Sequence, residues 1–192
     1  MKIVFATNNS NKLEEIKNLV SENINIISLS DIKCIEELPE TQLTLEGNAL
    51  QKAHYIYSKY GFDCFADDTG LEIDALDGEP GVFSARYAGL RCLAKDNMNK
   101  VLAKLNGVSN RKAKFRTVIA LILDGNEYLF NGECLGEITT NKKGLDGFGY
   151  DPIFLPVNSE LTFAQMSKSE KGIISHRGIS VRKLVDFLSI KH

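Results

Sequence analysis

Apolar and polar positions follow one another along the chain in blocks that predict strands and helices in turn. Ile3–Ala6 is a short continuous apolar run, which is typical of a strand buried on both faces. The polar residues Thr7–Asn11 follow, and apolar side chains then recur at helical spacing over residues 13–20. The chain therefore begins with a predicted strand, polar loop and helix, and Ile24–Leu29 predicts a second strand.

The middle of the chain continues this alternation. A helix is predicted over Leu45–Tyr60, where Gly61 ends it, and a buried strand is predicted over Phe62–Ala66. Asp67–Gly70 then forms a polar turn, after which a strand can resume over Leu71–Ile73.

Later segments add a hairpin to the pattern. Gly78–Gly81 predicts a turn and Leu93–Leu105 a helix. Val118–Leu123 is the most apolar predicted strand, and Asp124–Asn126 is a hairpin turn that leads to Tyr128–Phe130.

The C-terminal part combines a loop and a helix. Gly144–Pro156 is a predicted loop rich in glycine and aromatic residues, and a helix follows around residues 181–188, with Ser175 as its candidate N-cap. Early strands that alternate with helices, followed by a hairpin, indicate an α/β protein with a mixed sheet and helices on its faces.

Composition narrows the possible functions. A chain of 192 residues suits one α/β domain over residues 1–192, with or without a second lobe. The net charge of -2 argues against general binding to nucleic acid polymers or membrane surfaces, and no apolar run approaches membrane length. Four scattered cysteines without a C-x-x-C pair predict reduced, mostly buried thiols in a cytoplasmic protein: Cys34, Cys64, Cys92 and Cys134.

A first candidate for chemistry is the loop Thr7–Lys12. Free backbone N–H groups and the positive end of a helix dipole suit phosphate at a junction between a strand and a helix, and Lys12 adds a full charge. The alternative, favoured on local grounds, is an ordinary loop with an Asn or Ser helix cap. The spacing of a P-loop is absent.

Carboxylates and lysines supply further candidates. Asp67 and Asp68 repel each other unless a cation lies near them, and Mg²⁺ takes one or two protein carboxylates together with water and phosphate oxygens. The alternative is a solvated acidic turn, about as probable from this motif alone. Glu40 is a possible second carboxylate for the same metal, although a Glu in a loop is usually solvated, and Lys52 is by default a surface lysine.

Two C-terminal motifs could hold a base. The aromatic residues in Gly147–Pro152 can form a flat platform for stacking, although a loop that plugs the core with one aromatic turned inward is slightly favoured. His176 and Arg177, with Lys171 shortly before them, could donate to a base edge, and a capped helix with a surface arginine is equally compatible. No histidine or cysteine lies in a spacing that indicates zinc or a nucleophilic triad.

Taken together, these motifs are the inventory of a magnesium nucleotide site, and their order resembles the inosine triphosphate pyrophosphatase family of noncanonical purine triphosphate pyrophosphatases. The segments that carry the resemblance are Thr7–Lys12, Phe65–Leu71, Pro80–Tyr87, Gly147–Phe154 and Ser175–Arg177. Together they span nearly the whole chain.

The resemblance implies a fold and a set of roles. The expected fold is an elongated mixed sheet flanked by helices, in two lobes with a central substrate cleft, usually as a homodimer. Asp68 would be the catalytic carboxylate and a metal ligand, and Glu40 the second ligand for Mg²⁺. The residues implied to bind the nucleotide are Thr7, Asn8, Asn9, Ser10, Asn11, Lys12, Lys52, Thr69, Phe148, Gly149, Tyr150, Asp151, Lys171, His176 and Arg177.

Two positions depart from the family pattern. Many members have Gly at the position of Asn8, so Asn8 is expected to stiffen the phosphate loop. Many have Glu at the position of Gly47, which leaves Glu40 and Asp67 to complete the metal ligands.

The reaction implied is hydrolysis of ITP, dITP and XTP to the monophosphate, with water attacking the α-phosphorus and pyrophosphate leaving. Asp68, Asp67 or a metal-bound hydroxide could activate the water, and the residues alone do not choose among them. The alternatives are a pyrophosphatase for pyrimidine or methylated nucleotides and a nucleotide sensor without turnover. Ser175–Arg177 and the loop of Phe148 argue against the first, and the carboxylates of Glu40, Asp67 and Asp68 argue against the second.

Overall fold

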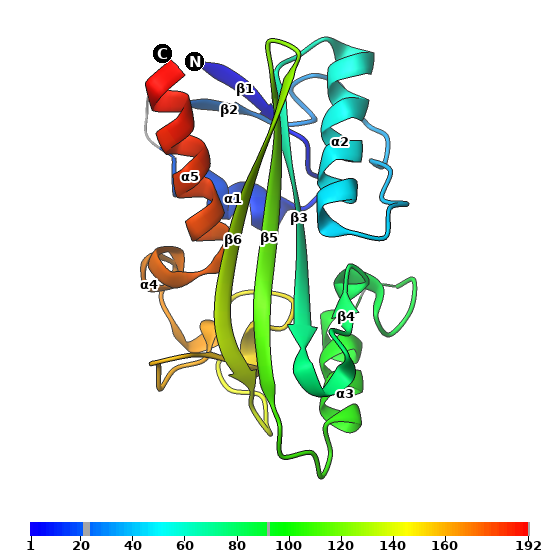
Figure 1. Ribbon diagram of the computed structural model, residues 1–192, viewed down its shortest axis with the longest axis vertical. Helices are drawn as coiled ribbons and strands as arrows, with labels where there is room; N and C mark the ends of the chain where they lie inside the picture. Colours follow the sequence, from blue (N-terminus) through cyan, green and yellow to red (C-terminus); the bar gives the residue numbers. More distant parts are fainter. Residues whose placement is uncertain (21–23, 92, 192) are drawn as a thin grey trace. The chain divides into compact units, whose positions relative to one another are not determined.

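The computed structural model describes residues 1–20, 24–91 and 93–191, so the expectation for Cys92 lies outside the described residues. The described strands form one mixed sheet in the order β2-β1-β3-β5-β6-β7, and β4 pairs with β3 (Figure 1). Their bounds are β1 (Lys2–Phe5), β2 (Asn25–Ile27), β3 (Cys64–Ile73), β4 (Pro80–Gly81), β5 (Lys112–Leu123), β6 (Asn126–Ile138) and β7 (Phe154–Pro156).

Parallel and antiparallel pairs both occur in this sheet. β1 pairs in parallel with β2 and β3, whereas β3 with β4 and β6 with β7 are antiparallel. The helices are α1 (Ser10–Lys17), α2 (Leu45–Tyr60), α3 (Ala94–Lys104), α4 (Lys168–Ile174) and α5 (His176–Lys191). The predicted α/β class with a mixed sheet is therefore confirmed. No helix in the described part of the chain is long and apolar enough to cross a membrane.

The chain divides into two compact units. Unit 1 comprises residues 1–68, 117–132 and 177–192, and unit 2 comprises residues 69–116 and 133–176. The boundaries fall inside β3, β5 and β6 and after the first residue of α5, so each of these strands contributes residues to both units.

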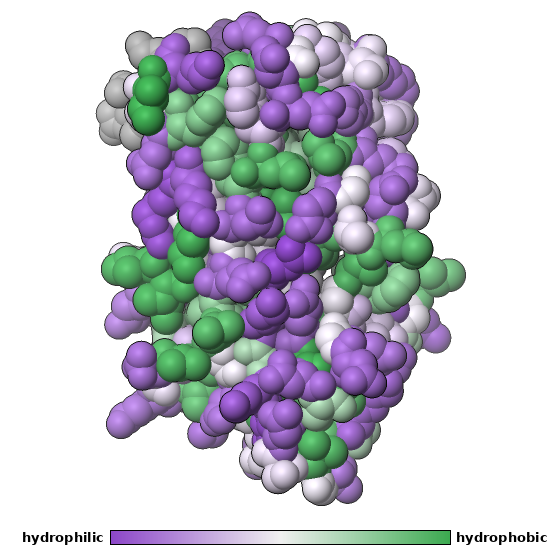
Figure 2. All heavy atoms as spheres, in the orientation of Figure 1, coloured by the Kyte–Doolittle hydropathy of each residue, from purple (hydrophilic) through white to green (hydrophobic). Residues whose placement is uncertain are grey.

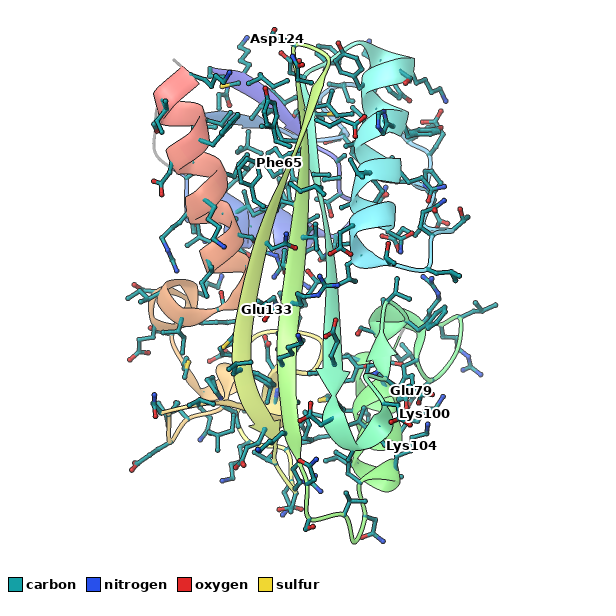
Figure 3. All side chains as sticks on the ribbon, viewed as in Figure 1. Phe65, Glu79, Lys100, Lys104, Asp124 and Glu133 are labelled. Atoms are coloured by element: carbon teal, nitrogen blue, oxygen red, sulfur yellow. The ribbon has the colours of Figure 1, made fainter. Side chains whose placement is uncertain are left out.

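In unit 1, helices cover both faces of the sheet. The apolar side chains of α1 and α5 share a core with alternate residues of the strands, including Phe65 (Figure 3). In that core the rings of Phe5 and Phe65 stack with centroids 4.6 Å apart. α2 lies on the opposite side of the strands from α5 (Figure 1), where the Cys64 thiol donates to the carbonyl of Ala53 at 3.2 Å. Alternate residues of β3 therefore meet different helices.

Unit 2 has its own core, formed by α3, the adjoining parts of β3, β5 and β6, and the segments around β7. Glu79 accepts hydrogen bonds from the Tyr87 hydroxyl at 2.7 Å and from Lys104 at 2.5 Å, which fastens the segment around β4 to α3 (Figure 3). Between β4 and α3, hydrophobic side chains gather at the surface (Figure 2), with Phe83 and Leu90 both well exposed.

Two strand predictions were too short. β3 runs without interruption through Asp67 and Asp68, because both carboxylates have cationic partners and need no turn to reach solvent. β5 begins at Lys112, well before the predicted Val118, since the half-buried Lys114 and Arg116 alternate with buried residues and pair with Glu72 and Glu133 on neighbouring strands.

Other boundaries also differ from the predictions. β6 continues to Ile138, and the loop Gly144–Pro156 contains the short strand β7. α1 ends at Lys17, before the last apolar residues assigned to it. The hairpin turn is confirmed, because Asp124 and Gly125 have φ values of 49° and 76°, as a two-residue turn requires.

Candidate functional site

Asp67 and Asp68 lie side by side in β3, and the alternation of side chains along a strand separates their carboxylates. Phe65 packs in the core beneath α1 and α5, so Asp67, two residues on, lies on the same face. Asp68 shares the opposite face with Cys64, beneath α2. The two adjacent carboxylates therefore contact two different groups of residues within unit 1.

Asp67 holds two cations. Its carboxylate lies 3.0 Å from Lys12 Nζ and 3.4 Å from Nη2 of Arg177, whose Nη1 also donates to Glu15. Burial alone raises the pKa of Asp67, but the charges of Lys12 and Arg177 outweigh it and hold the pKa below its ordinary range. Asp67 is therefore an ionised anchor that orients the lysine of the predicted phosphate loop.

Asp68 has a different environment. Its Oδ2 accepts from Asn48 Nδ2 at 3.1 Å, and its Oδ1 lies 3.5 Å from Lys52 Nζ. Burial raises the pKa of Asp68 above its ordinary value, against the charge of Lys52. Neighbouring carboxyls whose pKa values are pushed in opposite directions are typical of sites that divide acid–base work.

The carboxylates of Glu40 and Asp68 converge on one cation. Lys52 Nζ lies 2.5 Å from Glu40 Oε1 as well as 3.5 Å from Asp68 Oδ1. Carboxylates are ligands that Mg²⁺ takes together with water and substrate phosphate, and the position between these two is filled by the ammonium of Lys52. No group of three or more His, Cys, Asp or Glu side chains that could hold a metal occurs among the described residues.

The loop between β1 and α1 is built on Asn9. Its side chain caps α1 by accepting from the backbone N–H groups of Asn11 and Lys12, at 3.0 and 3.3 Å, and its own N–H donates to the Thr7 hydroxyl. Asn9 is thus the N-cap of α1, which is the alternative that the sequence offered for this loop, and Lys12 lies in the first turn of the same helix. The Asn8 amide bonds to the backbone of residues 36 and 38, which agrees with the expected stiffening of the loop.

Unit 2 contains the predicted aromatic turn, and its two aromatic residues differ. Tyr150 is buried and donates to the carbonyl of Ser84 at 2.8 Å, so one ring is turned inward, whereas Phe148 is only half-buried. Asp151 closes the turn by accepting from the N–H of Phe148 at 2.8 Å and from Lys171 at 2.7 Å. Phe148 is therefore the aromatic residue of this turn that remains suited to stacking.

The turn depends on two glycines. Gly147 and Gly149 have φ values of 75° and 63°, and a Cβ on Gly147 would lie 2.1 Å from Asp151 Oδ2. A side chain at position 147 would displace the carboxylate that closes the turn. The glycines that marked this motif in the sequence are thus required by its backbone.

The remaining predicted residues lie in different surroundings. In unit 2 the His176 ring stacks on Phe115, with centroids 4.5 Å apart, and Thr69 follows Asp68 in β3. In unit 1 the guanidinium of Arg177 is buried against carboxylates. The role of His176 and Arg177 as donors to a base stays a prediction.

Sequence reasoning missed two residues of this site. Asn48 donates to Asp68, and Glu15 receives Arg177. Asn48 stands four residues before Lys52, so helical periodicity places both on one face of α2 and could have revealed Asn48. Glu15 gave no such signal, because its partner is 162 positions away in sequence.

Comparison with known proteins gives consistent matches. The model of the Ham1 family matches residues 3–187. A dITP/XTP pyrophosphatase from Flavobacterium johnsoniae is 56% identical over 189 residues, covering 98% of each chain. The solved structure of the Staphylococcus aureus Ham1 protein aligns with a TM-score of 0.91 at 38% identity over 100% of both chains, and a HAM1 protein from Coxiella burnetii aligns with a TM-score of 0.90 at 37% identity over 98% of both.

Proposed function

The chain belongs to the Ham1 family, and on this premise we propose that it is a hydrolase that converts dITP, XTP and ITP to the monophosphate and pyrophosphate. The family expected from the sequence motifs is thereby confirmed. Relatives named dITP/XTP pyrophosphatase match at 54–56% identity over nearly the full chain. Their names give dITP and XTP, and ITP is added to the proposal because it carries the same base as dITP.

The observation that carries the proposal is the arrangement around Asp68. A buried carboxylate, fixed by Asn48, faces the ammonium of Lys52 together with Glu40, whose side chain is 36% exposed. Such a pair suits a nucleotide whose phosphates arrive with a divalent ion. Lys12, held on Asp67 in the same unit, supplies a further positive charge for the phosphates.

In the proposed reaction, water attacks the α-phosphorus, and the bond from this phosphorus to the bridging oxygen breaks. Asp68 orients the water and accepts its proton, while pyrophosphate leaves with the electron pair of the broken bond. Lys12 and Lys52 stabilise the negative charge on the phosphate oxygens. A Mg²⁺ ion held by Glu40 and Asp68 would supply Lewis-acid stabilisation of the departing charge.

The preference for these purines has a simple basis. Hypoxanthine and xanthine carry a 6-oxo acceptor, whereas adenine carries a 6-amino donor. A pocket lined with donors pairs with the oxo group, but with adenine it leaves buried donors facing a donor, at a cost of about 1–3 kcal/mol per group. We assign base binding to unit 2, where Phe148 and its neighbours Gly149, Tyr150 and Asp151 form the aromatic turn.

Three further expectations of the resemblance belong to the same proposal. Residues 1–192 act as a single catalytic domain, with both compact units required for turnover. The chain works as a homodimer and in the cytoplasm. Thr7–Lys12, Thr69, Lys171, His176 and Arg177 contribute to nucleotide binding.

Replacing Asp68 tests this proposal. Asp68→Asn keeps the shape of the side chain and removes the proton acceptor, so turnover of ITP is expected to fall by about 10²–10⁴-fold while the protein stays folded. Pyrophosphate release and thermal unfolding are measured on the same samples. Asp74→Asn, in the exposed turn after β3, is the matched control. Activity of Asp68→Asn close to that of the wild type would contradict the role assigned to Asp68.

A further inference from the structure

Asn48 is a polar side chain in a place where polar groups are uncommon. It lies on the buried face of α2 and is only 1% exposed. A buried amide needs hydrogen-bond partners for its NH₂ group and its carbonyl oxygen. The groups that form these bonds with Asn48 are therefore held in place by the fold. Those partners link the residues that the proposed function assigns to catalysis and metal binding.

The orientation of the Asn48 amide follows from its partners. The backbone N–H of Gln42 can only donate, so the Asn48 carbonyl Oδ1 must face it, at 2.9 Å. The NH₂ group then necessarily faces Asp68 Oδ2, at 3.1 Å. One planar group thus holds a carboxylate with one end and a loop backbone with the other.

This hydrogen bond sets the rotation of the Asp68 carboxylate. With Oδ2 engaged by Asn48, Oδ1 is directed to Lys52 Nζ, which also contacts Glu40. Rotation of the carboxylate about the Cβ–Cγ bond of Asp68 would break its hydrogen bond to Asn48. Asn48 therefore determines which oxygen of Asp68 faces Lys52.

The loop at the other end of Asn48 follows Glu40 directly. Two hydrogen bonds join Thr41 to Gln51. The Gln51 side chain accepts from the backbone N–H of Thr41 at 2.9 Å and donates to the Thr41 hydroxyl at 2.8 Å. Gln42 approaches α2 so closely that a Cβ on Gly47 would lie 2.7 Å from Gln42 Cβ. The backbone beside Glu40 is thus seated on the first turns of α2.

We propose that Asn48 is a positioning residue that fixes the orientation of the Asp68 carboxylate and ties it to the segment carrying Glu40. The inference rests on the proposed function, which assigns catalysis to Asp68 and metal binding to Asp68 and Glu40. Asn48 need not touch the nucleotide. Its loss therefore lowers the rate of the chemical step rather than the affinity for substrate.

Two substitutions test the proposal. Asn48→Ala removes both hydrogen bonds, and Asn48→Asp keeps the acceptor for Gln42 but faces Asp68 with a second carboxylate. Because partners that orient an active group are typically worth 10–100-fold, kcat for ITP is expected to fall about 10–100-fold in Asn48→Ala and further in Asn48→Asp. KM is expected to change less than about twofold. Asn99→Ala and Asn99→Asp, at an exposed position of α3, are the matched controls.

The kinetic constants are expressed per nucleotide-binding site, counted by calorimetric titration with the α,β-methylene analogue of ITP, so that partial unfolding does not count as lost catalysis. A purely structural role would reduce the number of sites and the melting temperature while kcat per site stayed constant. An unchanged kcat per site in both Asn48 variants, or an effect on KM alone, overturns the proposal. A wild-type enzyme without activity on ITP would instead overturn the proposed function.

Discussion

Asp67 and Asp68 are adjacent in the chain, but β3 presents them to different helices. Asp67 is engaged by Lys12 and Arg177, whereas Asp68 faces Asn48 and Lys52. The sequence motif suggested a shared cation between the two carboxylates. β3 instead gives each carboxylate its own cationic contact, which supports the proposal that Asp68 rather than Asp67 accepts the proton.

Gly47 offers a test at the scale of one residue. Alanine normally stabilises a helix by about 1 kcal/mol relative to glycine, but the close approach of Gln42 makes the added methyl group cost about 1–3 kcal/mol. Gly47→Ala is therefore expected to be less stable than the wild type by about 1 kcal/mol. Urea unfolding followed by circular dichroism measures this difference.

The matched variant removes the obstacle. Gln42→Gly removes the contact at 2.7 Å and leaves Thr44 Oγ1, 3.0 Å from the added Cβ, as its nearest neighbour. Gly47→Ala is therefore expected to lower the free energy of unfolding less in the Gln42→Gly background than in the wild type. If Gly47→Ala alone were more stable than the wild type, the close approach of Gln42 would not be what requires glycine there.

Single residues differed in how far the sequence revealed them. Lys12, Glu40 and Asp68 were singled out by residue type and motif, and the structure brings Glu40 to the same lysine as Asp68. Asn48 was missed although helical spacing places it on the same face of α2 as Lys52, because residue type alone does not mark an asparagine on a helix. Its role depends on which backbone passes beside α2, and that is set by the fold.

At the scale of an element, the aromatic turn Gly147–Asp151 depends on a buried ion pair. Lys171 on α4 contacts Asp151, and both side chains are less than 10% exposed. Removing one partner leaves an uncompensated buried charge. Lys171→Met is therefore expected to lower the free energy of unfolding by about 3 kcal/mol, measured by urea unfolding at neutral pH.

A second variant separates this ion pair from direct substrate binding. Asp151→Asn in the Lys171→Met background removes the stranded charge and should recover part of the lost stability. If Lys171→Met raised KM for ITP without changing stability, Lys171 would act on the nucleotide alone, and the turn would be held by other contacts.

Elements were predictable where local signals agree. α2 spans the predicted Leu45–Tyr60, because Thr44 caps its start and Gly61 ends it in the left-handed region at φ 71°. β3 and β5 were predicted too short, since charged residues inside them looked like loop. Their charges are satisfied by partners distant in sequence, such as Arg116 with Glu72, and single-sequence patterns do not show such pairs.

At the scale of the whole molecule, the polar group around Asp67 and Asp68 draws on segments from across the sequence. Lys12 lies on α1, Glu40 and Lys52 come from the loop before α2 and from α2, and Arg177 lies in the first turn of α5. Periodicity predicted the class of fold and most elements. The meeting of these segments was expected only through the family resemblance, because sheet order depends on long-range pairing.

The central claim is metal-dependent cleavage at the α-phosphorus of noncanonical purine triphosphates. The most direct test incubates the purified protein with ITP, dITP, XTP, GTP, ATP and dTTP in Mg²⁺, with and without EDTA, and identifies the products by chromatography. We expect monophosphate and pyrophosphate from ITP, dITP and XTP, little from the other three, and none in EDTA. Diphosphate and orthophosphate, equal turnover of ATP, or binding of ITP without any product would contradict the account.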